Sequence, residues 1–331
     1  MNIVVTGGAG FIGSHFIKHI LRKYSGYKIL NIDKLTYAGN PENLEEAEDN
    51  PDYTFVKEDI CSKRIIEKVV EGYDVIVNFA AESHVDRSIE EPEVFLKTDV
   101  MGTFNLLEIC RTAGFKKYIQ ISTDETYGSA GGGETFSEES PLNPSNPYSA
   151  SKAAADLLVL SYSKTYKLPV NIARSTNNYG PNQYPEKFIP LFVTNAIEDK
   201  PLPLYGDGKN VRDWLFVEDN CRGIDVILHK GIDGEIYNIA GENERENIFI
   251  AKKIIECLDK SEQLIKPVKD RPGHDRRYSI SCGKIKGLGW KPEVSLEDGL
   301  RLTVDWYKTH PQWWKKIKSG EFLEYYKKHY K

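Results

Sequence analysis

The chain has 331 residues, of which 40% are hydrophobic and 28% charged, a length that fits one large α/β unit or roughly two domains. The formal net charge of −5 gives no support to nucleic acid or an anionic membrane surface as the main partner. Five scattered cysteines without metal-ligand spacing predict free thiols in a reducing compartment and no metal site: Cys61, Cys110, Cys221, Cys257 and Cys282.

Short apolar runs alternate with helical patterns over the first half of the chain. Buried strands are predicted at residues 2–6, 28–32, 53–56, 74–78, 118–122 and 170–173. Helical spacing is found at residues 11–24, 64–70, 103–112 and 148–166. This alternation predicts an α/β fold with a Rossmann-type, doubly wound parallel sheet. Because the first strand begins at residue 2 and no apolar run could span a membrane, we expect no signal peptide and a cytoplasmic location.

The alternation of strands and helices ends after about residue 175. Residues 177–219 are rich in Pro, Gly, Asn and Tyr and predict loops over a site, while residues 249–258 and 296–307 predict further helices. We therefore expect a dinucleotide-binding domain over residues 1–175, with some return of the chain near residues 210–240. Residues 176–331 are expected to form a smaller, interleaved α/β domain that binds the substrate.

A glycine-rich turn follows the first predicted strand. Gly7, Gly10 and Gly13 would let the backbone approach a pyrophosphate at the N-terminus of the next helix, although a purely structural turn is the alternative. Asp33 ends the second strand, 20 residues beyond Gly13, where an acid accepts ribose hydroxyls and favours NAD over NADP. Asp59, after the third strand, is a candidate adenine contact, with a helix N-cap as the alternative.

Tyr148 and Lys152 are spaced by one helical turn and therefore share a helix face. An ammonium beside a phenol stabilises the phenolate, so we expect Lys152 to lower the pKa of Tyr148 and to hold the nicotinamide ribose as well. A pair with this spacing usually belongs to a solvated face. Here it follows a dinucleotide-type turn and a strand that ends in Ser122-Thr123, which favours a base acting on a sugar hydroxyl.

Asp124 and Glu125 follow the fifth predicted strand directly, within the stretch STDETYG. Two acids at the end of a buried strand are costly, and neighbours on a regular strand point to opposite faces. The alternation need not hold at the carboxyl end of a strand, where the chain turns and ligands bind. Two carboxyl groups with separated protonation preferences can supply an acid and a base. A helix-cap or turn role is the alternative.

Taken together, these motifs resemble the extended short-chain dehydrogenase/reductases and, within them, the dTDP-glucose 4,6-dehydratases. The closer resemblance is carried by residues 80–88 (AAESHVDRS), 122–125 (STDE), 177–181 (NNYGP), 185–187 (PEK), 212–214 (RDW), 271–277 (RPGHDRR) and the Trp-rich segment 306–330. Thr126, where the family commonly has Val, and Ser175-Thr176 depart from the family pattern at positions without an expected chemical role. Residues 129–145 form a short, Gly-rich segment.

The resemblance implies an NAD-dependent lyase that converts dTDP-glucose to dTDP-4-keto-6-deoxyglucose and water, a step toward rhamnose-type deoxysugars. C4 is oxidised, water is lost across C5 and C6, and the hydride returns to C6. The resemblance assigns Glu125 as the base at C5, Asp124 as the acid at O6, Thr123 as a hydrogen-bonding group near O4, and Tyr148, with Lys152, as the base at O4. It also implies a homodimer through a four-helix interface made by residues 103–112 and the helix of Tyr148.

The binding residues follow from the same resemblance. NAD is expected to contact Gly7, Gly10, Phe11, Ile12, Gly13, Asp33, Lys34, Leu35, Thr36, Asp59, Ile60, Ala80, Ala81, Ser83, Thr98, Tyr148, Lys152 and Asn178. The nucleotide sugar is expected to contact Ser83, Thr123, Asn177, Lys187, Phe188, Pro203, Tyr205, Arg212, Asn247, Arg271 and His274. The cationic members of this set suit a diphosphate. The basic aromatic tail, with Lys315-Lys316 and Lys327-Lys328, is predicted to be a solvated terminal helix rather than a nucleic-acid surface.

Three alternatives stay open. A sugar 4-epimerase would use the same Tyr, Lys and NAD but needs no adjacent acid and base. A UDP-glucose 4,6-dehydratase would differ only in the base of its substrate. A non-catalytic dinucleotide sensor would be free to lose Tyr148 and Lys152, both of which are present here.

Overall fold

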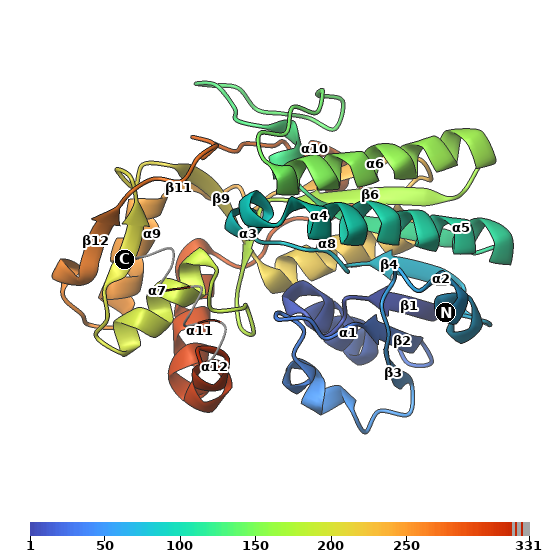
Figure 1. The fold of residues 1–331 in the computed structure, drawn as a ribbon, viewed down its shortest axis with the longest axis horizontal. Helices are drawn as coiled ribbons and strands as arrows, with labels where there is room; N and C mark the ends of the chain where they lie inside the picture. The colour runs from blue at the N-terminus through green and yellow to red at the C-terminus, as the bar shows by residue number, and fades with distance from the viewer. Residues whose placement is uncertain (320–321, 323–325, 327–331) are drawn as a thin grey trace.

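A seven-stranded parallel sheet forms the centre of the computed structural model, which describes residues 1–319, 322 and 326 (Figure 1). The strands are β1 (Asn2–Thr6), β2 (Lys28–Asp33), β3 (Tyr53–Lys57), β4 (Val75–Asn78), β5 (Lys117–Thr123), β6 (Val170–Ser175) and β10 (Ile236–Ile239). Their order is β10-β6-β5-β4-β1-β2-β3, so successive strands are added on one side of β1 and then on the other, which creates a ligand-binding switch point between β1 and β4. The predicted fold class is confirmed, and the six predicted strands differ from the observed ones by at most two residues at either end.

Helices cover both faces of this sheet because side chains alternate along each strand. On one face, Ile3 and Val5 of β1 pack in a core with α1 (Phe11–Lys23) and α8 (Val217–Lys230). On the other face, Val4 packs in a core with α2 (Lys63–Val69), α5 (Thr103–Ala113) and α6 (Pro147–Tyr166). Figure 1 shows α5 and α6 side by side on one face and α1 on the other.

The second half of the chain contributes two small sheets and a core of its own. The strands are β7 (Asn177–Tyr179), β9 (Val211–Phe216) and β11 (Glu244–Glu246) in one sheet, and β8 (Leu202–Tyr205) and β12 (Ile265–Val268) in the other. The helices of this core are α7 (Phe188–Ile197), α9 (Asn247–Cys257), α11 (Leu296–Thr309) and α12 (Pro311–Ile317). The expectation of loops over residues 177–219 is wrong. Helix α7 is apolar on nearly every side and buried, so it lacks the amphipathic period that marks a surface helix.

The remaining elements are short. They are η1 (Pro41–Ala47), α3 (Val85–Glu90), α4 (Pro92–Phe95), the π-helical turn η2 (Leu96–Gly102), η3 (Asp124–Tyr127), η4 (Glu262–Leu264) and α10 (Gly283–Gly287).

Part of the second half returns to the large sheet, since β10 pairs with β6 and α8 packs beside α1. The domain boundary at residue 175 stays a prediction. Within the basic tail, Lys315 and Lys316 lie in α12, whereas Lys327 and Lys328 lie outside the described residues. None of the helices in the described part of the chain is both long and apolar enough to cross a membrane.

Candidate active site

The turn between β1 and α1 holds the backbone close to its neighbours. Gly7 has a φ of +69°, and a Cβ there would lie 2.6 Å from the backbone nitrogen of Ala80. A Cβ at Gly13 would lie 2.4 Å from the carbonyl oxygen of Gly7. Helix α1 starts after Gly10 without a capping bond from any described side chain, so its first N–H groups remain available to an anion. The turn therefore has the geometry that a pyrophosphate requires.

Asp33 lies at the carboxyl end of β2 with both oxygens oriented by backbone donors. Its Oδ2 accepts the N–H of Ala9 at 2.9 Å and its Oδ1 accepts the N–H of Leu35 at 2.8 Å. Burial raises the pKa of this carboxyl group. Each carboxylate oxygen retains a further lone pair, so Asp33 can still accept ribose hydroxyls, and its charge would oppose a 2′-phosphate.

Asp59 pairs with Lys34 at 2.7 Å and accepts the N–H of Cys61 at 2.9 Å. The N-cap of α2 is Ser62, so the alternative role of Asp59 as that cap is wrong. Asp59 instead lines the same cavity as the glycine turn.

One cavity brings together every predicted cofactor residue except Leu35, whose backbone supports Asp33. It runs past the glycine turn to Asn178, whose buried Oδ1 has no hydrogen-bond partner among the described residues. An unpaired buried oxygen, an open helix N-terminus and a ribose-type acid in one cavity suit a dinucleotide. The residues present therefore fit NAD.

The acid pair lies where β5 changes into a helical turn. β5 ends at Thr123 and η3 begins at Asp124, so the two acids are not neighbours on a regular strand, as expected from their place at its carboxyl end. The hydroxyl of Thr123 accepts the N–H of Glu125 at 3.2 Å and is the N-cap of this turn. Neither acid caps the turn, so the helix-cap part of the alternative is wrong, whereas both acids do lie within a turn.

Asp124 is placed to be a proton donor. Its side chain is 2% exposed, its Oδ1 lies 3.2 Å from the hydroxyl of Thr123, and its Oδ2 has no partner in the part of the chain that the structure describes. Burial, followed by the charge of Glu125, raises the pKa of Asp124 well above its usual value. A neutral carboxyl group beside a second acid suits general-acid chemistry.

The pairing of Tyr148 and Lys152 differs from the prediction. The ammonium of Lys152 donates to the carbonyl oxygen of Ile121 at 2.7 Å. The pKa of Tyr148 is raised well above its usual value, first by burial and then by the charges of Glu125 and Asp99. The expected lowering of this pKa by Lys152 is therefore wrong for these side chains, because burial and the two carboxylates outweigh the ammonium. Both residues nevertheless line the cavity, as predicted.

A buried acid that the motifs did not reveal supports this region. Asp99 lies in the π-helical turn η2, a kind of irregularity that is frequent at functional sites. It accepts the N–H of Glu82 at 2.9 Å and the hydroxyl of Ser151 at 2.6 Å. Burial raises the pKa of Asp99 to about 6 and that of Glu82 to about 7. Asp99 thus ties the loop after β4 to the helix that carries Tyr148.

A second cavity contains every predicted substrate residue except Thr123, which lines the first one. The two cavities share Ser83, Glu125, Asn177 and Lys187. Glu125 therefore faces both the space that fits a dinucleotide and the space that would hold a substrate.

Three cations line the second cavity, Arg212 buried and Lys187 and Arg271 partly buried. Arg271 pairs with Asp86 at 3.2 Å, while Arg212 donates to carbonyl oxygens and has no ion-pair partner in the described chain. The pKa of Lys187 and that of Arg212 are both lowered by burial. Cations that are withdrawn from solvent with incomplete compensation favour an anionic ligand.

Neutral polar groups complete the second cavity. His274 accompanies the cations, and its pKa is lowered to about 4, first by burial and then by Arg271. Asn177, Asn247 and the indole N–H of Trp214 each keep a buried polar atom without a partner among the residues described. Sequence reasoning missed Trp214 as a ligand donor, although it lies within the RDW motif.

Comparisons with known proteins identify relatives that match nearly the whole chain. The protein-family model described as GDP-mannose 4,6 dehydratase matches residues 4–303. A dTDP-glucose 4,6-dehydratase of Neisseria meningitidis is 46% identical over 344 residues and covers 97% of both chains. The structure of a Bacillus anthracis dTDP-glucose 4,6-dehydratase in complex with NAD is 52% identical, with a TM-score of 0.91 over 96% of this chain and 100% of that one. A Streptomyces venezuelae enzyme of the same name, with NAD and thymidine diphosphate bound, is 46% identical, with a TM-score of 0.94 over the same shares.

Proposed function

Because the chain belongs to the dTDP-glucose 4,6-dehydratase family of NAD-dependent lyases, we propose that it converts dTDP-glucose to dTDP-4-keto-6-deoxyglucose and water. The observation that carries this proposal is the position of Glu125 in the lining of both cavities, beside a buried Asp124 whose pKa is raised by burial. A dehydration needs a base at C5 and an acid at O6 on one substrate, and these two carboxyl groups supply that pair.

The side chains divide the reaction between them. NAD, when bound, accepts the C4 hydride and returns it to C6. Tyr148 takes the O4 proton, with Thr123 beside that oxygen to hold its orientation. The ketone at C4 acidifies the C5 hydrogen, which Glu125 removes while Asp124 gives its proton to the leaving O6. Burial, followed by the charges of Glu125 and Asp99, raises the pKa of Tyr148 and keeps the phenol protonated, so a positive charge close to the phenol is needed for it to act as the base.

The second cavity supports a nucleoside diphosphate as the recognition element. Lys187, Arg212 and Arg271 are suited to the two phosphates, and the unpaired atoms of Asn247 and Trp214 to neutral polar groups of the ligand. A 4-epimerase would need the tyrosine and NAD but no acid for O6, so the buried Asp124 favours dehydration. The relatives named above favour thymidine over uridine.

A substrate assay tests this proposal. We expect purified enzyme to convert dTDP-glucose to a product with the alkaline absorbance of a 4-keto-6-deoxy sugar, without added oxidant or reductant. We expect UDP-glucose to react at least about tenfold more slowly, since one lost base contact is worth about 1.4 kcal/mol or more. Interconversion of UDP-sugars without loss of water would instead support the epimerase alternative.

We also propose that the protein is a cytoplasmic homodimer. Its five cysteines are unpaired, which suits a reducing compartment. Exposed apolar side chains on adjacent helices, Val94 of α4, Leu96 and Met101 of η2 and Leu157 of α6, offer a face for a second copy of this chain. A two-fold interface that joins α5 and α6 to their counterparts would bury them.

Sedimentation checks the dimer. Leu157 is 58% exposed, and we expect Leu157→Asp to shift the protein from dimer to monomer at micromolar concentration. Helix α11 lies away from α5 and α6 (Figure 1), and Leu302 on it is 50% exposed, so Leu302→Asp serves as a matched control. A wild-type monomer would contradict the proposal.

A further inference from the structure

A chain of hydrogen-bonding side chains reaches Glu125 from the segment that follows β12. The hydroxyl of Tyr278 lies 3.2 Å from Glu125 Oε2 and 2.8 Å from Asp275 Oδ2. The same oxygen of Asp275 accepts a hydrogen bond from the hydroxyl of Ser145. Tyr278 is 2% exposed, and the guanidinium of Arg212 lies 4.1 Å from its ring centroid. The phenol is thus buried between two acids, one of which faces both cavities.

A phenol has one proton, and an ionised carboxylate can only accept. Tyr278 can therefore donate to Glu125 or to Asp275, but not fully to both. Burial, followed by the charge of Glu125, raises the pKa of Tyr278 well above its usual value, so the phenol keeps this proton at neutral pH. Once Glu125 is protonated, it becomes a donor to the phenol oxygen, and the phenol proton can turn to Asp275. Glu125 then has a hydrogen-bond partner in the phenol of Tyr278 both as a carboxylate and as a protonated acid.

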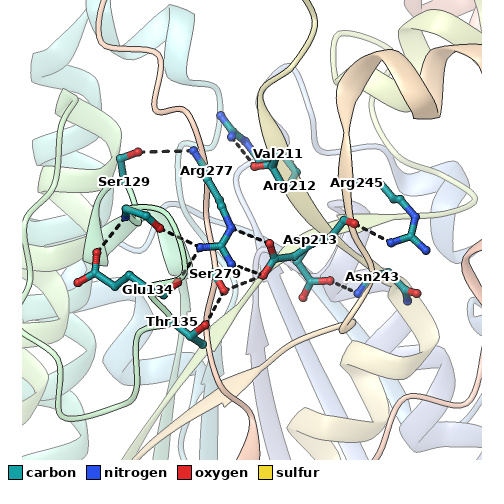
Figure 2. Close-up of polar contacts among 12 residues, drawn as sticks. Ser129, Glu134, Thr135, Val211, Arg212, Asp213, Asn243, Arg245, Arg277 and Ser279 are labelled. Atoms are coloured by element: carbon teal, nitrogen blue, oxygen red, sulfur yellow. Dashed lines mark hydrogen bonds and ion pairs between the residues drawn. The ribbon is translucent and has the colours of Figure 1, made fainter.

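The backbone around Tyr278 is anchored on both sides. Figure 2 shows Arg277 between the segment that contains Ser129 and Glu134 and the strands of the three-stranded sheet. Its guanidinium binds both oxygens of Glu244 at 2.8 and 2.9 Å and the carbonyl oxygen of Glu134 at 2.6 Å. The N–H of Tyr278 donates to Val211 of β9 at 3.3 Å. This bidentate ion pair and these backbone bonds hold the phenol at a set distance from Glu125.

We propose that Tyr278 is a positioning residue for the C5 base, and that it moves its hydrogen bond from Glu125 to Asp275 as Glu125 takes the C5 proton. In this step the C5–H bond breaks, its electron pair forms the C4=C5 double bond of the enolate derived from the C4 ketone, and the proton bonds to Glu125. The phenol loses no proton overall, because it only changes its acceptor. The inference rests on the proposed function, which assigns Glu125 to C5.

The test is Tyr278→Phe, which removes the hydroxyl and keeps the ring under Arg212. Wild type and variant are mixed with dTDP-glucose in deuterium oxide, and the absorbance of enzyme-bound NADH and the deuterium at C5 are followed. We expect NADH to form at close to the wild-type rate and then to accumulate. Exchange at C5 should fall about ten- to a hundredfold, the value of one hydrogen bond to a charged group. A purely structural defect would slow both steps together.

Two further variants separate the hydroxyl from general packing. Tyr127→Phe removes another buried phenol hydroxyl, one bonded to Asn238 at 2.9 Å, and should not accumulate NADH. Asp275→Asn disturbs the second acceptor and should repeat the split between oxidation and exchange even if Tyr278→Phe fails to fold. Exchange of the C5 hydrogen within about threefold of wild type, in a folded Tyr278→Phe or in Asp275→Asn, would overturn this inference and leave the proposed function standing. A wild type that does not dehydrate dTDP-glucose would overturn the proposed function, and this inference with it.

Discussion

The roles of the two acids can be separated by Glu125→Gln and Asp124→Asn. Each substitution removes the ability of one carboxyl group to take up or give a proton and keeps the shape of the side chain. A general base or acid contributes about 10²–10⁴-fold, which is about 3–5 kcal/mol of the barrier. In Asp124→Asn, the amide oxygen can still accept from Thr123, where Oδ1 now lies 3.2 Å from the hydroxyl. The side chain is 2% exposed, so bulk water has little access to replace the lost proton donor. The loss therefore falls on the departure of O6 alone.

Stopped-flow absorbance and proton exchange distinguish the two variants. Glu125→Gln should form enzyme-bound NADH on mixing with dTDP-glucose, because Tyr148 is intact, but should show no deuterium exchange at C5. Asp124→Asn should form NADH and retain exchange at C5 while water loss slows. Dehydration by Glu125→Gln within a few-fold of wild type, which is well below the loss of a general base, would refute this reasoning and make the acid pair structural.

Other side chains give independent predictions. Tyr148→Phe should fail before any NADH absorbance appears, unlike either acid variant. Asp33→Ser should lower the affinity for NAD by about tenfold or more in a titration, because the carboxylate that accepts ribose hydroxyls is lost. The same change should reduce the preference for NAD over NADP. Although burial opposes it, hydrogen bonds from His19 and Lys23 lower the pKa of Asp225 to about 2. The folded pKa lies below the unfolded one, so this contribution, on the order of 2 kcal/mol, is present above about pH 4 and lost as the pH falls toward about 2. Denaturant titrations of Asp225→Asn should show no such loss over that window.

Local patterns predicted much of the fold. The apolar runs of the large sheet and the glycine turn are set by neighbours in sequence, so their positions could be read directly. Helix α7 could not be predicted, because a helix buried on all sides has no polar face to reveal its period. The π-helical turn that holds Asp99 also has no sequence signature of this kind.

The site shows the same limit. The spacing of Tyr148 and Lys152 predicted a shared helix face but not the acceptor of the ammonium, which is the carbonyl oxygen of Ile121 on a different element. Tyr278 meets Glu125 across 153 positions of sequence, a contact that only the tertiary fold creates. The residue stands directly after the RPGHDRR motif, and that adjacency was the one signal that could have pointed to it.

The central claim is that hydride removed at C4 returns to C6 of the same substrate molecule. dTDP-glucose carrying deuterium at C4 tests it directly, with the product examined by NMR and mass spectrometry. The account predicts that the deuterium appears at C6 of dTDP-4-keto-6-deoxyglucose, accompanied by one solvent-derived hydrogen at C5. Deuterium found in released NADH, or retained at C4 of an epimerised sugar, would contradict it.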